Sequence, residues 1–293
     1  MTDKPSVNYD DPLASSEEVS QDDIDRITDE IVTAIQRPKQ GDPAESGADG
    51  YMDPHALPSC GETDDDCGEP MPFFCAGCGD HFTKSHRCKR SRCPDDAPLW
   101  AVDRAENDVA RLQTVCRVMS SEMGESVKKH HLTFMPPSDW FLQADDPVRK
   151  TREVVAEILK ILNAEGAVYY HGWSGIESDD RGDWKNWVMN QRDWDEVRHE
   201  LKPRPHFHAL AASPFVVGGE VTKRVEEETG WVIERIADNE TGESQKDLTA
   251  AAFASTYSLS HTSIHLNYAE NGNNRAIKAG YGKLWNSVNV RPP

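Results

Sequence analysis

The sequence is poor in basic residues and has no long hydrophobic run. Of 293 residues, 32 are Lys or Arg and 51 are Asp or Glu, so the formal net charge is −19. No stretch approaches the about 18 consecutive apolar residues that indicate a membrane-spanning helix. The first twenty residues lack the basic and apolar regions of a secretory signal, so we expect a cytoplasmic protein with no membrane partner. A chain this acidic is normally a poor binder of nucleic acid, because phosphates repel it.

The acidic charge is concentrated at one end of the chain. Residues 1–70 hold 19 Asp or Glu and only 4 Lys or Arg, so they account for −15 of the net charge. They are also rich in Ser, Gly and Pro, and too poor in apolar residues to offset the entropy of ordering. We expect an acidic disordered tail over 1–70 whose removal leaves activity largely intact. Within it, the spacing of isoleucines over Asp22–Ile35 predicts one amphipathic helix that docks on the body or on a partner.

Lysine is scarce throughout the chain. The sequence has 14 Lys and 18 Arg against 28 Asp and 23 Glu. This balance resembles that of proteins from salt-in halophiles, in which hydrated carboxylates keep the protein soluble in molar salt. The alternative is an ordinary acidic protein with an acidic tail.

Cysteine is also sparse, but the seven cysteines are clustered. An odd number, without a secretory signal, argues against a disulfide framework. The spacing Cys75-x2-Cys78-x9-Cys88-x4-Cys93 suits a tetrahedral Zn²⁺ site and predicts a zinc-binding module over 71–97. The same loop carries five Lys or Arg residues between positions 84 and 92. These bases favour phosphate contacts, although a purely structural zinc site remains the alternative. Cys60 and Cys67 are weaker candidates for an extended site.

The remainder, 98–293, alternates between helical and strand patterns, so we expect one sheet with flanking helices. Apolar periodicity predicts strands at 129–135, 167–176, 204–212 and 231–236, with a further strand at 263–268. It predicts helices at 98–126, 147–163, 219–229 and 247–260.

Candidate catalytic residues lie on these elements. His206 and His208 share one face of a strand and can converge on one divalent ion. Glu177, at the end of the preceding strand, is a candidate third ligand, and such a set suits Mg²⁺ or Mn²⁺ acting on a phosphate. Tyr257 and His261 share a face at the end of a helix. A tyrosine phenol beside a metal-bound phosphate can act as a nucleophile.

These motifs carry a resemblance. LTFMPP at 132–137, GWSGIE at 172–177, PHFHAL at 205–210 and YSLSH at 257–261 stand in the order seen in HUH endonucleases. The chain resembles the rolling-circle replication initiators (Rep proteins) of archaeal, especially haloarchaeal, plasmids and viruses, and HRCKRSRCP at 86–94 is similar to their cysteine-rich region. Two departures stand out. Many Rep proteins have Tyr-x-x-Lys where this chain has Ser260 and then His261, and the cysteine region often ends C-P-x-C where this chain has Asp96.

The resemblance implies an α+β fold with a five-stranded antiparallel sheet, the histidine pair on a central strand and the tyrosine on a helix beneath. It implies His206, His208 and Glu177 as metal ligands and Tyr257 as the single nucleophile, with Tyr268 and Tyr281 as less favoured candidates. The enzyme would nick single-stranded origin DNA, leaving a 5′-phosphotyrosine and a 3′-OH, and would work with host DNA polymerase and helicase. Two alternatives remain: an HUH transposase or relaxase, and a non-catalytic zinc DNA-binding protein.

Overall fold

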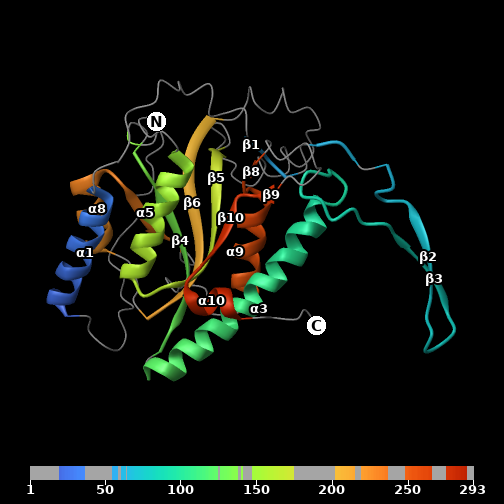
Figure 1. The fold of residues 1–293 in the computed structure, drawn as a ribbon, viewed down its shortest axis with the longest axis horizontal. Helices are drawn as coiled ribbons and strands as arrows, with labels where there is room; N and C mark the ends of the chain where they lie inside the picture. The colour runs from blue at the N-terminus through green and yellow to red at the C-terminus, as the bar shows by residue number, and fades with distance from the viewer. Residues whose placement is uncertain are drawn as a thin grey trace, which may run out of the picture.

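The centre of the molecule is a five-stranded antiparallel sheet in the order β10-β5-β6-β4-β7 (Figure 1). Its strands are β4 (Lys128–Met135), β5 (Glu165–Ser174), β6 (Lys202–Ser213), β7 (Val232–Arg235) and β10 (Lys278–Tyr281). The computed structural model describes residues 20–36, 55–58, 61–63, 65–124, 126–137, 140, 147–174, 202–214, 219–236, 248–265 and 275–288.

The two faces of the sheet differ because successive side chains along a strand alternate. One face carries Leu132 and Phe134 of β4 with Phe207 of β6, and these side chains are buried in an apolar cluster. The opposite face carries histidines of β4 and β6 together with Tyr169 of β5. The central strand β6 therefore presents apolar groups to one layer and imidazoles to the other.

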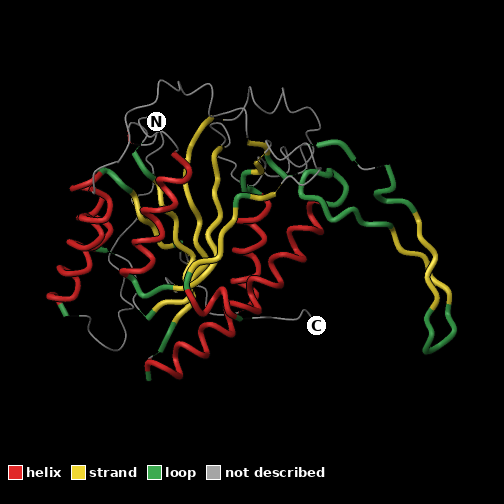
Figure 2. Tube along the Cα trace, viewed as in Figure 1, coloured by secondary structure: helices red, strands yellow, loops and turns green. Residues whose placement is uncertain are grey.

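The apolar face is covered by α1 (Gln21–Gln36), α5 (Pro147–Ile161) and α8 (Glu220–Thr229) (Figures 1 and 2). The isoleucine stripe of α1 is buried in this layer, where α1 packs against both α5 and α8. Arg224 of α8 also forms ion pairs with Asp25 and Asp29 of α1.

The histidine face is covered by α3 (Ala97–Met123) and α9 (Leu248–Ser260), which pack on each other, and by the short α10 (Lys283–Ser287) (Figure 1). Helix α3 ends at Gly124, whose φ of 71° is left-handed, and the Gly124 N–H donates to the carbonyl of Ser120. Glycine adopts this conformation at a helix end at little steric cost.

Two smaller sheets lie beside the main one. The strands β1 (His55–Ala56), β8 (Ile264–His265) and β9 (Arg275–Ala276) form the first. The second is a two-stranded ribbon, β2 (Pro70–Phe74) and β3 (His81–Ser85), which projects from the body near the start of α3 (Figure 1). In the part of the chain that the structure describes, no helix is both long and apolar enough to cross a membrane.

The α+β class, the five-stranded antiparallel sheet and the flanking helices are confirmed. Two expectations need correction. The segment 1–70 is not disordered throughout, because α1 forms part of the core and β1 pairs with β8. Of the strand expected at 263–268, Ile264–His265 lies in a separate sheet and 266–268 lie outside the described residues, whereas β10 is the fifth strand of the main sheet.

Candidate metal centre and active site

Three imidazoles meet on the sheet face beneath α9. His206 and His208 lie on β6, and His171 lies on β5 directly opposite His206 in the strand register. One ring nitrogen from each of the three lies within 4.8 Å of the other two. The register shifts just beyond His171, and such irregularities recur next to active sites because they change the direction of a side chain. Three nitrogen donors at this spacing can hold one metal ion.

Hydrogen bonds indicate which ring nitrogen His171 and His208 can offer to a metal. His171 Nε2 lies 2.8 Å from the carbonyl oxygen of Ser258 on α9, and a carbonyl can only accept, so Nε2 carries the proton. The lone pair of His171 is therefore on Nδ1. His208 Nδ1 lies 2.7 Å from Nε2 of His131 on β4, which leaves His208 Nε2 as its nitrogen for a metal. Partners of this kind hold ligand rings in orientation.

Burial keeps these rings neutral. Burial, with the charges of neighbouring histidines second, holds the pKa of His171 and of His208 well below the ordinary value. Burial alone lowers the pKa of His131 to about 4. Neutral imidazoles have the free lone pair that a metal requires, so the cluster is ready to bind an ion at neutral pH.

Helix α9 brings Tyr257 and His261 to the same place. The Tyr257 ring centroid lies 5.8 Å from that of His208 and 4.5 Å from that of His261. His261 is buried, and its Nδ1 donates to the Tyr257 carbonyl at 2.8 Å, so its basic nitrogen is Nε2. The half-buried Tyr257 therefore lies beside both the imidazole cluster and the buried His261.

The end of α9 is fastened to β5, which fixes this arrangement. The Ser263 N–H donates to the Tyr170 carbonyl at 2.8 Å, and the Gly172 N–H donates to Ser263 Oγ at 2.9 Å. A Cβ at Gly172 would lie only 3.2 Å from Ser263 Oγ and from the Tyr170 hydroxyl. The close approach at Gly172 thus keeps the helix that carries Tyr257 against the strand that carries His171.

A buried ion pair lies on the same sheet face. Lys278 Nζ of β10 contacts both carboxylate oxygens of Asp108 on α3, at 2.5 and 2.6 Å, and the Tyr169 hydroxyl donates to Asp108 Oδ2 at 2.6 Å. The Tyr169 hydroxyl is also 3.3 Å from Ser255 Oγ of α9. This network joins α3, α9, β5 and β10, so it holds the layer that carries Tyr257 in position.

The predicted residues His206, His208, Tyr257 and His261 are thus brought together. Glu177, the predicted third ligand, lies outside the described residues, as does Tyr268. The ligand that sequence reasoning missed is His171. Alternation in the predicted strand places His171 on the same face as Tyr169, which the sequence could have indicated. Only the register between β5 and β6 shows that His171 lies opposite His206.

The second group of metal-ligating side chains is Cys67, Cys88 and Cys93, whose sulfurs lie within 4.8 Å of one another. Cys67 Sγ and Cys93 Sγ are 3.5 Å apart, too far for a disulfide of about 2 Å. The separation is near the about 3.8 Å between two sulfurs that share a tetrahedral zinc ion.

The predicted set therefore changes: Cys75 and Cys78 do not join Cys88 and Cys93 in the described structure, and Cys67 does. Cys75 and Cys78 lie in the turn that connects β2 to β3, whereas Cys67 and Cys88 flank the base of the ribbon. Five-residue strands at about 3.3 Å per residue hold the turn roughly 15 Å from that base. Cys60 lies outside the described residues.

The three thiols at the ribbon base differ in the direction in which the protein shifts their pKa. Burial raises the pKa of the Cys67 and Cys88 thiols. Burial also opposes ionisation of Cys93, but hydrogen bonds from the backbone N–H groups of Asp95 and Asp96 outweigh it and lower the Cys93 pKa. Of the three thiols, Cys93 is thus the one whose ionised form the protein favours, and binding of a cation would favour ionisation of the other two.

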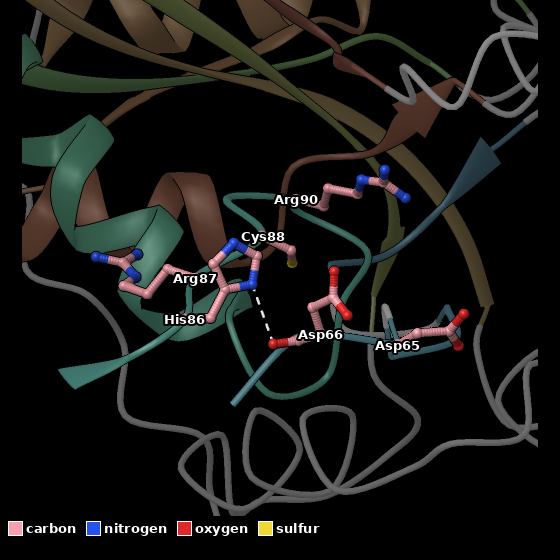
Figure 3. A pocket seen from close by; sticks show the side chains of 6 residues that line it. All are labelled: Asp65, Asp66, His86, Arg87, Cys88 and Arg90. Carbon is pink, nitrogen blue, oxygen red and sulfur yellow. Dashed lines mark hydrogen bonds between the residues drawn. The ribbon is translucent and has the colours of Figure 1, made fainter. Parts of the chain in front are cut away.

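A pocket of about 360 Å³ opens beside these thiols (Figure 3). Asp65, Asp66, His86, Arg87, Cys88 and Arg90 line it, and His86 Nδ1 contacts the Asp66 carbonyl at 3.0 Å. The Arg87 guanidinium is held by the buried Asp96 at 2.7 Å, with Asp103 of α3 at 2.9 Å. Asp96 thus anchors the ribbon base to α3 through an ion pair.

No protein-family model matches this chain, and comparisons with curated proteins and with solved structures likewise yield no match. The interpretation of the site therefore rests on its own residues and their geometry.

Proposed function

We propose that this protein is a metal-dependent endonuclease of the HUH type that nicks single-stranded DNA through Tyr257 and starts rolling-circle replication. The observation that carries the proposal is the meeting of the imidazoles of His171, His206 and His208 with a tyrosine from α9. The Tyr257 ring lies 5.8 Å from that of His208. A tyrosine whose only role was to fill the core would be expected to pack against apolar side chains rather than against a cluster of imidazoles.

The donor set fits a divalent transition ion held by His171, His206 and His208. Imidazole nitrogens suit such ions better than they suit Mg²⁺, which prefers oxygen, so of the two expected ions we favour Mn²⁺. The ion, when bound, supplies Lewis-acid polarisation of a phosphate oxygen. The Ser258 carbonyl holds His171 in the tautomer that binding requires, and His208 offers Nε2 to a metal when its Nδ1 donates to His131 Nε2.

The tyrosine performs the covalent step. The Tyr257 hydroxyl oxygen bonds to the scissile phosphorus as the bond from phosphorus to the 3′ oxygen breaks. The phenol gives up its proton, and the departing oxygen takes one to become a free 3′-OH. His261, whose Nε2 is the basic nitrogen, is the proposed acceptor of the phenol proton. The 3′-OH primes host DNA polymerase as a helicase unwinds the duplex.

The experiment is a covalent-adduct assay with labelled single-stranded origin DNA and Mn²⁺ in high salt. We expect a DNA–protein adduct with the wild type, none with Tyr257→Phe, and normal yield with the matched controls Tyr268→Phe and Tyr281→Phe. His171→Ala should also abolish the adduct. An adduct that persists in Tyr257→Phe refutes the assignment of the nucleophile. No cleavage with any divalent ion, at any salt concentration, would leave the non-catalytic zinc-binding alternative.

Zn²⁺ is the ion we propose for Cys67, Cys88 and Cys93. Thiolate donors and their tetrahedral spacing support it. Bound zinc measured by mass spectrometry should fall by one ion per chain in Cys67→Ser. The control Cys116→Ser, in α3, should keep the wild-type content. Equal zinc in both variants would overturn this ligand set.

A further inference from the structure

The β2–β3 ribbon exposes aromatic side chains that no other part of the described structure covers. All ten residues of its two strands are exposed, and Phe74 has 60% of its surface accessible. A two-stranded hairpin by itself is at best marginally stable in water. Exposed apolar groups gathered on one element mark an interaction surface.

One face of the ribbon combines rings with a cation. Phe73 and Phe82 are direct cross-strand partners, and their rings stack with centroids 5.7 Å apart and planes 11° from parallel. Lys84 Nζ lies 5.3 Å from the Phe82 centroid and 5.8 Å from that of Phe73. Strand alternation adds Met71 to this face, and none of the ten residues of the two strands carries a carboxylate. In a chain with a net charge of −19, such a face is complementary to an anion with flat apolar groups.

The ribbon is also placed to guide a strand towards the imidazole cluster. Its base is tied to the first turns of α3 through Arg87, Asp96 and Asp103. The start of α3 and the end of α9, where Tyr257 lies, are at the same end of the molecule (Figure 1). A polymer that passes the active site can therefore continue onto the ribbon.

We propose that the ribbon face formed by Met71, Phe73, Phe82 and Lys84 is a docking surface for single-stranded DNA. Bases stack on the two phenylalanine rings, and the Lys84 ammonium contacts a backbone phosphate. Stacking of this kind tolerates any sequence, because every base has a π-face. The choice of DNA as the strand rests on the proposed function, whereas the stacking surface itself does not.

The test measures binding of fluorescein-labelled oligothymidylate to the full-length protein by anisotropy, without divalent metal. Phe73→Ala and Phe82→Ala should each weaken binding about 5-fold or more, the effect of losing one stacked base. Phe74→Ala is the matched control, since this exposed ring lies on the opposite face, and it should bind like the wild type. Phe73→Trp should restore affinity, and Lys84→Gln should reduce the salt dependence by about one phosphate contact.

Unchanged affinity in the Phe73→Ala, Phe82→Ala double variant would overturn the proposal. The same would follow if that variant became monomeric in sedimentation while its DNA affinity stayed constant, because the ribbon would then bind a second copy of the chain. Tyr257→Phe separates this proposal from the nuclease. It should keep full oligothymidylate affinity while losing adduct formation. Adduct formation with no ribbon effect would refute the ribbon alone, and ribbon-dependent binding with no adduct under any condition would refute the nuclease alone.

Discussion

The helix nearest the N-terminus should be essential for stability, and Ile31→Ala is the sharpest test. Ile31 is fully buried, 0% exposed, in the layer where α1 meets α5 and α8. Replacing a buried isoleucine by alanine costs about 2–5 kcal/mol, because transfer free energy is lost and a cavity remains. Whole domains are stable by only about 5–15 kcal/mol. A single side chain of this helix is therefore worth a large share of the total.

The helix as a whole contributes more. Ile27, Ile31, Val32 and Ile35 are all buried, and at about 1.5–3 kcal/mol each they give a gross contribution of roughly 6–12 kcal/mol. This is an upper value, since the unfolded chain already buries part of that surface. It equals the stability of a typical domain, so a chain lacking residues 1–70 should unfold and lose cleavage. This prediction is the opposite of the expectation from the sequence, which was that activity survives removal of residues 1–70.

The assay is urea unfolding of the full-length protein in high salt, followed by circular dichroism. Ile31→Ala should lower the urea midpoint, with a fall in melting temperature of order 10 °C. Thr33→Ala is the control, because Thr33 lies on the exposed side of the same helix and should change stability by no more than about 0.5 kcal/mol. Equal midpoints for the two variants would show that α1 does not dock in solution, and the reasoning would fail.

Three further predictions concern His131, Asp108 and His130. His131→Gln should weaken Mn²⁺ binding about 10- to 100-fold in calorimetry, because His208 loses the partner that orients it, and an unchanged affinity would exclude that role. Asp108→Asn should lower stability by about 3–5 kcal/mol in urea unfolding, since the partly buried Lys278 ammonium loses its counter-charge, and a loss below about 1 kcal/mol would refute the burial argument. Burial lowers the pKa of His130 to about 4 in the folded protein. As the pH falls, the unfolded chain therefore binds a proton at this histidine before the folded protein does. The contribution of His130 to the stability of the metal-free protein is full above about pH 7 and is lost as the pH drops below 6.5. Between pH 7.5 and 5.5 this histidine alone costs about 1.4 kcal/mol, and a His130→Gln variant with the wild-type pH profile would contradict the assignment.

Most of the fold could be predicted because periodicity is a local property. The apolar spacing of α1 and α5 and the alternation in β4 and β6 are present in short windows of sequence. The fifth strand, β10, has only four residues, and it forms because β5 offers an open edge. Edges exist only once the sheet is assembled, so this strand was not predictable.

The candidate site divides in the same way. His206 and His208 could be placed on one face because every second residue of a strand points to the same side of the sheet. His171 required knowledge of which residue of β5 lies opposite which residue of β6, and that register is set by the whole sheet. The thiol set failed for a related reason. The two predicted cysteine pairs can form one site only if the chain between them turns back, and here the five residues of β3 run extended between Cys78 and Cys88.

The net charge of −19 and the chemistry of the site are connected through solvent. In molar salt the Debye length is about 3 Å, so repulsion between an acidic surface and a phosphate backbone is screened almost at contact. The same screening removes most of the attraction that a basic groove would provide. A protein for such a solvent gains little from surface lysines, and its specific contacts must be ones that salt does not weaken. Buried neutral imidazoles and stacked aromatic rings, such as those of Phe73 and Phe82, meet that requirement. If the protein works in molar salt, as its composition led us to expect, then the acidic composition and the use of imidazoles and aromatic rings for specific contacts follow from one physical condition.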